Sequence, residues 1–217
     1  MSLLEVHDLV VRFGQGFQVG PASLAMDRGI LLLQGPNGGG KTTLMKAMSG
    51  ALVPTAGRVL VSGQDVHRHA PARRHISFVS AIPELPDFLS VTEAYQFAAS
   101  LRRVPNWNGA PLCEALNLDP ALMLARASAG QRQKAEFICA LAGDPAVLLL
   151  DETFAHLDQA SLAQVCVWLR EWSTSRVIIF AHHGESPLRP DATLHIDRQS
   201  IALDNQLSAG VVTLPRH

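Results

Sequence analysis

This chain of 217 residues has few cysteines and tyrosines, three and one, and almost no net charge, with a formal value of −1. Cys113, Cys139 and Cys166 are widely spaced and form no CxxC pair, which argues against a disulfide framework. Free cysteine is usually buried, so we expect three buried, reduced thiols in a cytosolic protein. A charge close to zero gives no general attraction to the phosphates of nucleic acid, and we expect no nucleic-acid partner.

Long hydrophobic runs are also absent. The longest apolar stretches, such as residues 146–150 (AVLLL) and 177–181 (VIIFA), have the length of a core strand, whereas a membrane helix needs about 20 apolar residues. The N-terminal segment lacks a basic region followed by an apolar stretch, so we expect no signal peptide. With 47% hydrophobic and 17% charged residues, the composition is that of a globular protein with one sizeable core.

Segments with the pattern of strands alternate with segments with the pattern of helices, which predicts an α/β fold with a mostly parallel sheet covered on both faces. The first segment, residues 3–13, alternates polar and apolar residues before a glycine-rich turn, and predicts N-terminal antiparallel strands. Further strands are expected at residues 29–35, 57–63, 74–80, 146–152 and 176–183, and helices at 41–50, 91–103, 128–143 and 161–172.

The segment from residue 83 to residue 142 differs in texture from the rest. Apolar residues recur at helical spacing in VTEAYQFAASLRR, and the connectors contain proline and glycine. This pattern predicts a helical subdomain inserted in the α/β core. We therefore predict a single domain over residues 1–217, with its core at about 1–82 and 143–217 and the helical subdomain at about 83–142.

A glycine-rich segment, GPNGGGKT, follows an apolar strand and opens a helix, which is the context that a phosphate loop requires. Its backbone N–H groups can surround the β- and γ-phosphates of a nucleotide, and the ammonium of Lys41 adds a positive charge. The hydroxyl of Thr42 is a ligand for Mg²⁺. The predicted ATP-binding residues here are Gly35, Pro36, Asn37, Gly38, Gly39, Gly40, Lys41, Thr42 and Thr43.

Two acidic residues, Asp151 and Glu152, stand at the C-terminal end of a buried strand. Ligands bind at this end of the strands in parallel sheets. On its own, the pair could be two loop carboxylates. Together with the phosphate loop it predicts a metal-binding Asp151 and a Glu152 that takes a proton from the attacking water. These elements indicate a phosphate-loop NTPase.

A second helix start, at ASAGQRQK, also has features of an anion site. Ser128 and Gln131 have the spacing of a capping box, in which each side chain binds the backbone of the other residue. A plain capping box explains Ser128 and Gln131 but not Gly130, which would allow another group to approach the backbone closely. Because a helix N-terminus attracts anions, the chain carries two candidate phosphate-facing helix starts.

With these motifs in order, the chain resembles the ATP-binding cassette (ABC) ATPase family. The family signature LSGGQ reads here as ASAGQ, with Ser128, Gly130 and Gln131 kept. DETFAHLD matches the stretch DEPTSGLD and keeps its last acid, Asp158, while FAHH matches the switch histidine with His182. The resemblance implies that His182 touches the γ-phosphate and that Phe13 stacks on adenine, although Phe13 could equally be a core residue of its strand. It also implies four ATP-binding residues in these motifs, Ser128, Gly130, Gln131 and Asp158.

The resemblance also explains why one chain has two phosphate-facing helix starts. In the family two cassettes face each other head to tail, and ATP with Mg²⁺ lies between the phosphate loop of one and the signature of the other. The resemblance therefore implies an ATPase with a second cassette as partner, in a homodimer or a heterodimer. It also implies polytopic membrane permease subunits as partners, and a peripheral position on the cytoplasmic face of the cell membrane.

Finer features favour a small bacterial exporter, similar to haem-exporter and drug-exporter cassettes. These features are the stretch at residues 73–105, Ala129 in the signature and Phe154 after DET. The apolar residues of 81–91 could receive a coupling helix of the permease, or could simply pack the helical subdomain.

One residue departs from the family pattern: Ala81 stands where the family has a glutamine, and a methyl group cannot bind Mg²⁺ or orient water. A low ATPase rate would fit this substitution. Two alternatives therefore remain beside the transporter subunit. One is a soluble ABC ATPase in an assembly or repair process, such as Fe–S cluster assembly, and the other is a degenerate, non-hydrolysing cassette with an active partner.

Overall fold

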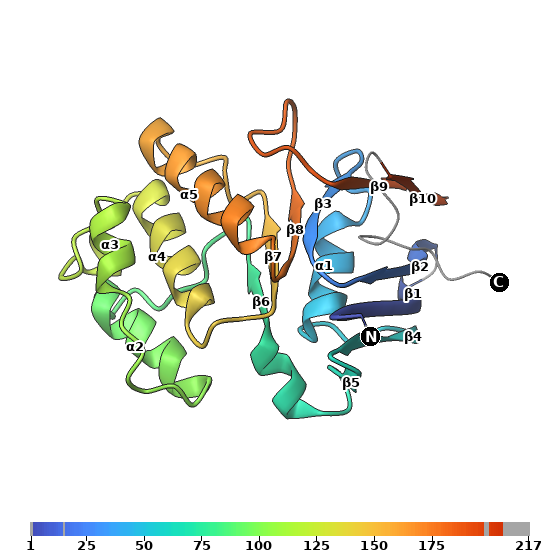
Figure 1. Cartoon of the computed structure of the whole chain (residues 1–217), viewed down its shortest axis with the longest axis horizontal. Coiled ribbons are helices and arrows are strands. Elements are labelled where there is room, and N and C mark those ends of the chain that lie inside the picture. The colour runs from blue at the N-terminus through green and yellow to red at the C-terminus, as the bar shows by residue number, and fades with distance from the viewer. Residues whose placement is uncertain (1, 15, 198–199, 206–217) are drawn as a thin grey trace.

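A six-stranded, mostly parallel sheet forms the centre of the chain in the computed structural model, which describes residues 2–14, 16–197 and 200–205 (Figure 1). Its strand order is β10-β9-β3-β8-β7-β6, and within the described part of this sheet only the β9–β10 pair is antiparallel. The predicted parallel sheet is therefore confirmed. Its strands are β3 (Gly29–Gln34), β6 (Ile76–Val79), β7 (Val147–Asp151), β8 (Val177–Ala181), β9 (Ala192–Asp197) and β10 (Ser200–Asn205).

A second sheet, antiparallel throughout, has the order β2-β1-β4-β5. The hairpin of β1 and β2 pairs Phe13 with Phe17 at its tip and Leu4 with Met26 at its base. This sheet confirms the predicted N-terminal antiparallel strands. Its strands are β1 (Leu4–Phe13), β2 (Phe17–Met26), β4 (Ala56–Val61) and β5 (Gln64–Asp65).

The four predicted helices begin and end close to the predicted residues, whereas the helix at Ala110–Ala115 was not predicted. Ser90 and Glu93 form a capping box at the start of α2, and Gly50, with φ of 83°, closes α1. No helix in the described part of the chain is long and apolar enough to cross a membrane. The α-helices are α1 (Lys41–Ser49), α2 (Val91–Leu101), α3 (Ala110–Ala115), α4 (Ala129–Leu141) and α5 (Gln159–Trp172), and 3-10 turns lie at Ala70–His75 and Leu124–Arg126.

Both faces of the parallel sheet are covered by apolar side chains. Along β3, Leu31 and Leu33 point into a core shared with α1 and the antiparallel sheet, while Ile30 and Leu32 point into a second core shared with α2 to α5. Each fully buried leucine or isoleucine contributes about 1.5–3 kcal/mol. A continuous apolar strand is therefore required at this position, which is why the run GILLLQ forms a central strand.

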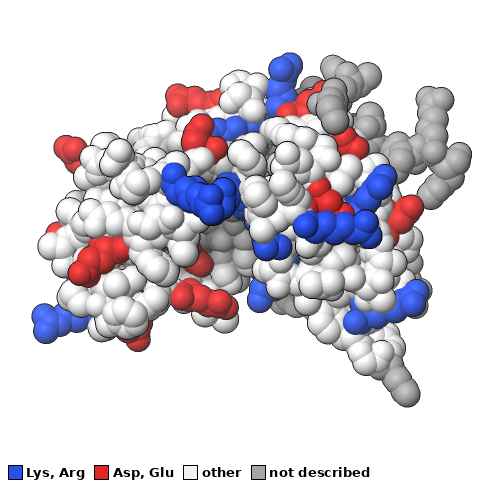
Figure 2. All heavy atoms as spheres, turned by 90° about the horizontal axis from the view of Figure 1, so that it is seen from below, with Lys and Arg blue, Asp and Glu red and all other residues white. Residues whose placement is uncertain are grey.

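The helices α2 and α3 pack on α4, and all three lie within residues 83–142, the segment predicted as a helical subdomain. The division of the chain into a core and a subdomain stays a prediction. On the face of the molecule seen in Figure 2, basic and acidic side chains are interspersed among large uncharged areas, in keeping with the net charge of −1.

Two of the three cysteines are buried, as predicted. Cys113 and Cys139 are buried, whereas Cys166 on α5 is partly exposed, so the prediction was wrong for this residue. Burial raises the pKa of the Cys139 thiol to about 12. This thiol is therefore protonated and unreactive at neutral pH.

Candidate nucleotide site

The phosphate loop joins β3 to α1 in a tight curve that only glycine permits at two positions. Gly40, the residue before α1, has φ of 105°, and a Cβ there would lie 2.4 Å from Val19 Cγ2. A Cβ on Gly35 would lie 2.1 Å from the backbone carbonyl oxygen of Ile196 in β9. Strand packing behind the loop thus accounts for both glycines.

Lys41 lies inside the curve of this loop. Its Nζ donates hydrogen bonds to the carbonyl oxygens of Gly35 at 2.8 Å and Pro36 at 3.2 Å, and the residue is only 6% exposed. A lysine side chain is flexible, and these two bonds hold its ammonium at the centre of the loop. Pro36 and Gly35 therefore position the charge that the sequence assigned to phosphate binding.

Thr42 and Asp151 are brought together from α1 and β7. The Thr42 hydroxyl donates a hydrogen bond of 2.6 Å to Asp151 Oδ2, and Asp151 is 1% exposed at the end of its strand. Hydroxyl and carboxylate oxygens are ligands that Mg²⁺ prefers. The residues that the sequence named for metal binding therefore lie side by side and fit this ion.

Glu152 follows Asp151 and turns its carboxylate towards two histidines. The residue has φ of 49°, and its backbone N–H donates to the carbonyl of Ala181 at 3.1 Å. Glu152 Oε2 lies 3.9 Å from His182 Nδ1, and Oε1 lies 3.3 Å from His183 Nε2. Neither Glu152 Oε1 nor His182 Nδ1 has a hydrogen-bond partner with good geometry among the described residues.

The phosphate loop, Asp151 and Glu152 line one cavity of about 180 Å³, which we call the phosphate cavity. Nine of its lining residues were predicted from the sequence, whereas Phe17 and His183 were not. Of the other predicted residues, His182 lies outside the lining and packs against the ring of Phe154, with centroids 6.0 Å apart. The lining consists of Phe17, Asn37, Gly38, Gly39, Gly40, Lys41, Thr42, Thr43, Asp151, Glu152 and His183.

Phe13, predicted to stack on adenine, is 44% exposed at the end of β1. It lies beside the cavity rather than in its lining, and its ring centroid is 6.0 Å from that of Phe17. The two residues face each other across the β1–β2 hairpin. A hairpin with its turn at the glycine-rich segment would pair Phe13 with Phe17, and this pairing was the sequence signal that could have identified Phe17.

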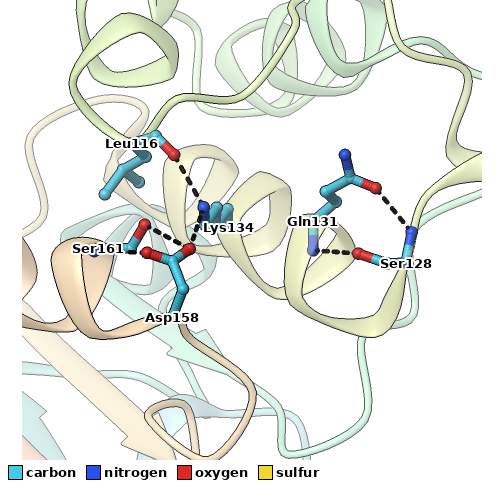
Figure 3. A network of polar contacts seen from close by, with 6 residues as sticks. All are labelled: Leu116, Ser128, Gln131, Lys134, Asp158 and Ser161. Carbon is cyan, nitrogen blue, oxygen red and sulfur yellow. Dashed lines mark hydrogen bonds and ion pairs between the residues drawn. The ribbon is translucent and has the colours of Figure 1, made fainter.

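The second helix start has the predicted capping box (Figure 3). Ser128 N–H donates to Gln131 Oε1 at 2.8 Å, and Gln131 N–H donates to Ser128 Oγ at 3.2 Å. Gly130 allows a close approach, as predicted, but the group that approaches is the chain's own backbone. A Cβ on Gly130 would lie 2.5 Å from the carbonyl oxygen of His156.

Asp158 joins the start of α5 to α4 (Figure 3). It caps α5 by accepting from the N–H and the hydroxyl of Ser161, both at 2.9 Å. Lys134 Nζ lies 2.6 Å from Asp158 Oδ2 and also donates to the carbonyl of Leu116 at 2.9 Å. The bond from Lys134, supported by those from Ser161, holds the pKa of Asp158 well below its usual range. Lys134 was not predicted as a site residue, because its partner Asp158 stands at the start of a different helix.

The signature residues line a different cavity, of about 440 Å³. None of its lining residues lines the phosphate cavity. Within the described part of one chain, the phosphate loop and the signature are therefore not brought together. The lining of this signature cavity consists of Asn117, Ser128, Gly130, Gln131, Lys134, His156 and Asp158.

The family description "ABC transporter" matches residues 21–155, which include the phosphate loop, the signature and both acidic residues. The chain belongs to the ABC transporter family. It is an ATP-binding cassette, as the sequence resemblance implied.

Relatives of this cassette include import proteins. The chain is 33% identical over 174 residues to the sulfate/thiosulfate import ATP-binding protein CysA of Thermosynechococcus vestitus, covering 77% of this chain and 52% of the relative. It is 34% identical over 165 residues to the spermidine/putrescine import ATP-binding protein PotA of Chromobacterium violaceum, covering 73% and 46%. The cassette thus spans about half the length of these relatives. The predicted exporter-type resemblance is not confirmed.

Solved structures confirm the fold of the cassette. An ATP-binding subunit of an ABC transporter superposes with a TM-score of 0.84 at 23% identity, covering 94% of this chain and 90% of that one. A dimeric ATP-binding cassette in a post-hydrolysis state, bound to ADP and Pi, superposes with a TM-score of 0.81 at 16% identity, covering 94% and 99%.

Ala81 follows β6 in a loop that α4 holds. Gln133 Nε2 donates to the carbonyl of Ser80 at 3.3 Å. Burial raises the pKa of Glu136 to about 7, although backbone N–H groups of Ser80 and Glu84 act in the opposite direction. One hydrogen bond from α4 thus reaches the residue before Ala81, while Ala81 itself offers only a methyl group.

Proposed function

We propose that this cassette binds ATP with Mg²⁺ in the phosphate cavity and hydrolyses it. The observation that carries the proposal is the meeting of Lys41, Thr42, Asp151 and Glu152 in one cavity, beside a row of loop N–H groups. Lys41 and the loop from Gly35 to Thr43 bind the phosphates, and Phe13 with Phe17 offers an aromatic surface to the base.

The metal ligands in this proposal are Thr42 and Asp151, whose oxygens already share a hydrogen bond. Mg²⁺, when bound with ATP, neutralises charge on the β- and γ-phosphates. Glu152 accepts the proton of the water that attacks the γ-phosphorus, and His182 contacts the γ-phosphate. Each role depends on the position of these groups at the carboxyl ends of β7 and β8, where parallel strands present ligands.

The signature completes the site from a second cassette in our proposal. The phosphate cavity and the signature cavity share no lining residue, and this separation supports a site that a second copy completes. In a head-to-tail pair, Ser128, Gly130 and Gln131 of one copy meet the γ-phosphate that is bound to the other copy. Asp158 also lines the signature cavity. Hydrolysis weakens this contact and lets the two cassettes separate.

The motion of such a pair drives transport through polytopic membrane permease subunits. The support is family membership together with the names of the relatives, which are import ATP-binding proteins. These names do not favour the export that the sequence suggested, so the proposal is transport without an assigned direction. The cassette then acts at the cytoplasmic face of the membrane as a peripheral protein.

A direct test measures the mass of the Glu152→Gln variant by size-exclusion chromatography with light scattering, with and without ATP and Mg²⁺. Loss of the general base slows hydrolysis by about 10²–10⁴ and traps an ATP-bound pair. We expect a dimer only with ATP, and a monomer when Lys41→Ala is added to the same variant. ATP binding without any dimer would contradict self-pairing and would direct the search to a different partner cassette.

A degenerate, non-hydrolysing cassette is the second candidate, and the observation that favours it is Ala81, which has no side-chain ligand for Mg²⁺ or water. This candidate predicts that the purified chain binds ATP without turnover. Steady phosphate release that is lost in Glu152→Gln would reject it.

A further inference from the structure

The phosphate cavity contains a histidine to which neither the sequence motifs nor the proposed function gives a role. His183 follows His182 in the loop after β8 and is one of the cavity's lining residues. Its Nε2 lies 3.3 Å from Glu152 Oε1, and its side chain is 49% exposed. His183 thus lies beside the carboxylate and is partly exposed.

Glu152 has few other groups that could hold it. Its Oε1 is buried and has no hydrogen-bond partner with good geometry among the described residues, and His182 Nδ1 lies 3.9 Å from Oε2. A buried carboxylate oxygen without a donor is costly, by about 1–3 kcal/mol or more. His183 Nε2 is the ring nitrogen placed to supply that donor.

The other charged groups of the cavity are already engaged. Lys41 donates to two carbonyls of the loop, and Asp151 accepts from Thr42. The carboxylate of Glu152 is therefore not fixed by a direct ion pair with Lys41 in this structure. A small rotation of His183 would convert the 3.3 Å contact into a hydrogen bond with good geometry.

We propose that His183 is a positioning residue for hydrolysis: its Nε2–H donates to Glu152 Oε1 and aims Oε2 at the attacking water. The inference rests on the proposed ATPase function and adds a residue to it. His183 in this role carries the hydrogen on Nε2, takes no proton in the reaction and does not bind ATP. Its removal affects turnover and leaves ATP affinity unchanged.

The experiment compares His183→Ala and His183→Gln with the wild-type chain, by steady-state ATP hydrolysis and by binding of a fluorescent ATP analogue with Mg²⁺. We expect His183→Ala to lower kcat by about 10- to 100-fold, the effect of a misplaced catalytic group, with KM for ATP and analogue binding unchanged. His183→Gln, whose amide N–H can reach Glu152 Oε1, should recover most of kcat. His75→Ala, on the exposed 3-10 turn, is the matched control.

A second comparison isolates the contact with Glu152. In the Glu152→Gln background, we expect His183→Ala to cause no further loss, because both changes remove the same function. An unchanged kcat in His183→Ala, an equal loss in the alanine and glutamine variants, or a full additional loss in the Glu152→Gln background would each overturn the inference.

The measurements distinguish a failure of the proposed ATPase function from a failure of the role of His183. If the wild-type chain hydrolyses ATP and Glu152→Gln does not, the proposed ATPase function stands whatever His183 does. A wild-type chain that binds the analogue but releases no phosphate would overturn both the ATPase function and the role of His183. Thermal melting of each variant identifies any loss that comes from unfolding.

Discussion

Removal of the Asp158 carboxylate should destabilise the cassette in a way that separates its two contacts. Asp158→Ala deletes the N-cap of α5, which costs about 1 kcal/mol. It also leaves the buried ammonium of Lys134 with only the Leu116 carbonyl among its hydrogen-bond partners, at a further cost of about 1–3 kcal/mol. Because the Asp158 side chain is 56% exposed, water replaces part of the lost contact. We expect a total near the low end, about 2–3 kcal/mol.

Two further variants assign this free energy to its sources. Asp158→Asn keeps an oxygen that can cap α5 and removes the charge, so it should recover about 1 kcal/mol of the loss. Lys134→Met removes the buried charge, and in that background Asp158→Asn should cost less than in the wild type. Urea unfolding without nucleotide measures each midpoint and slope. Equal losses for Asp158→Ala and Asp158→Asn, or strict additivity with Lys134→Met, would refute this account of the network.

Two other predictions follow from close contacts and burial. Gly130→Ala places a Cβ 2.5 Å from the carbonyl oxygen of His156 and should lower the free energy of unfolding by about 1–3 kcal/mol. The control Ala129→Ser, at an exposed neighbouring residue, should change this free energy little. An unchanged urea midpoint in Gly130→Ala would contradict the contact. The raised pKa of Glu136 means that the folded chain holds this proton more tightly than the unfolded chain, so its contribution to stability is fully present below about pH 4.5 and is lost as the pH rises to about 7. Glu136→Gln should remove this part of the pH dependence in unfolding experiments at pH 4.5 to 8, and a curve parallel to that of the wild type would count against the shift.

The parts of the site that were predictable depend on neighbours in the sequence. The phosphate loop and Asp151 are recognisable because a strand, a glycine-rich turn and a helix follow one another over a few residues, and this order dictates where each group lies. The capping box at Ser128 is similarly local. The hydrogen bond between Thr42 and Asp151 then follows from the parallel pairing of the strands.

What the sequence missed depends on contacts between distant segments. Phe17 reaches the cavity because the β1–β2 hairpin pairs it with Phe13, and His183 does so because of the direction of the loop after β8. Lys134 lies on the predicted helix, but its pairing with Asp158 depends on how α4 and α5 pack. The hairpin of β9 and β10 was not predicted, although β9 supplies the backbone against which the phosphate loop packs.

The nucleotide site proposed here is shared between two cassettes, and a mixture of two defective variants tests this arrangement. Lys41→Ala disables the phosphate loop, and Ser128→Arg blocks the signature with a bulky side chain. A mixed pair would still contain one intact site, made from the phosphate loop of the Ser128→Arg copy and the signature of the Lys41→Ala copy.

The measurement is ATP hydrolysis by each variant alone and by their equimolar mixture. The account predicts little activity for either variant and recovery to about a quarter of the wild-type rate in the mixture, because half of the pairs are mixed and each has one of two sites. A mixture no more active than its components, beside an active wild type, would contradict a site shared between two copies of this chain.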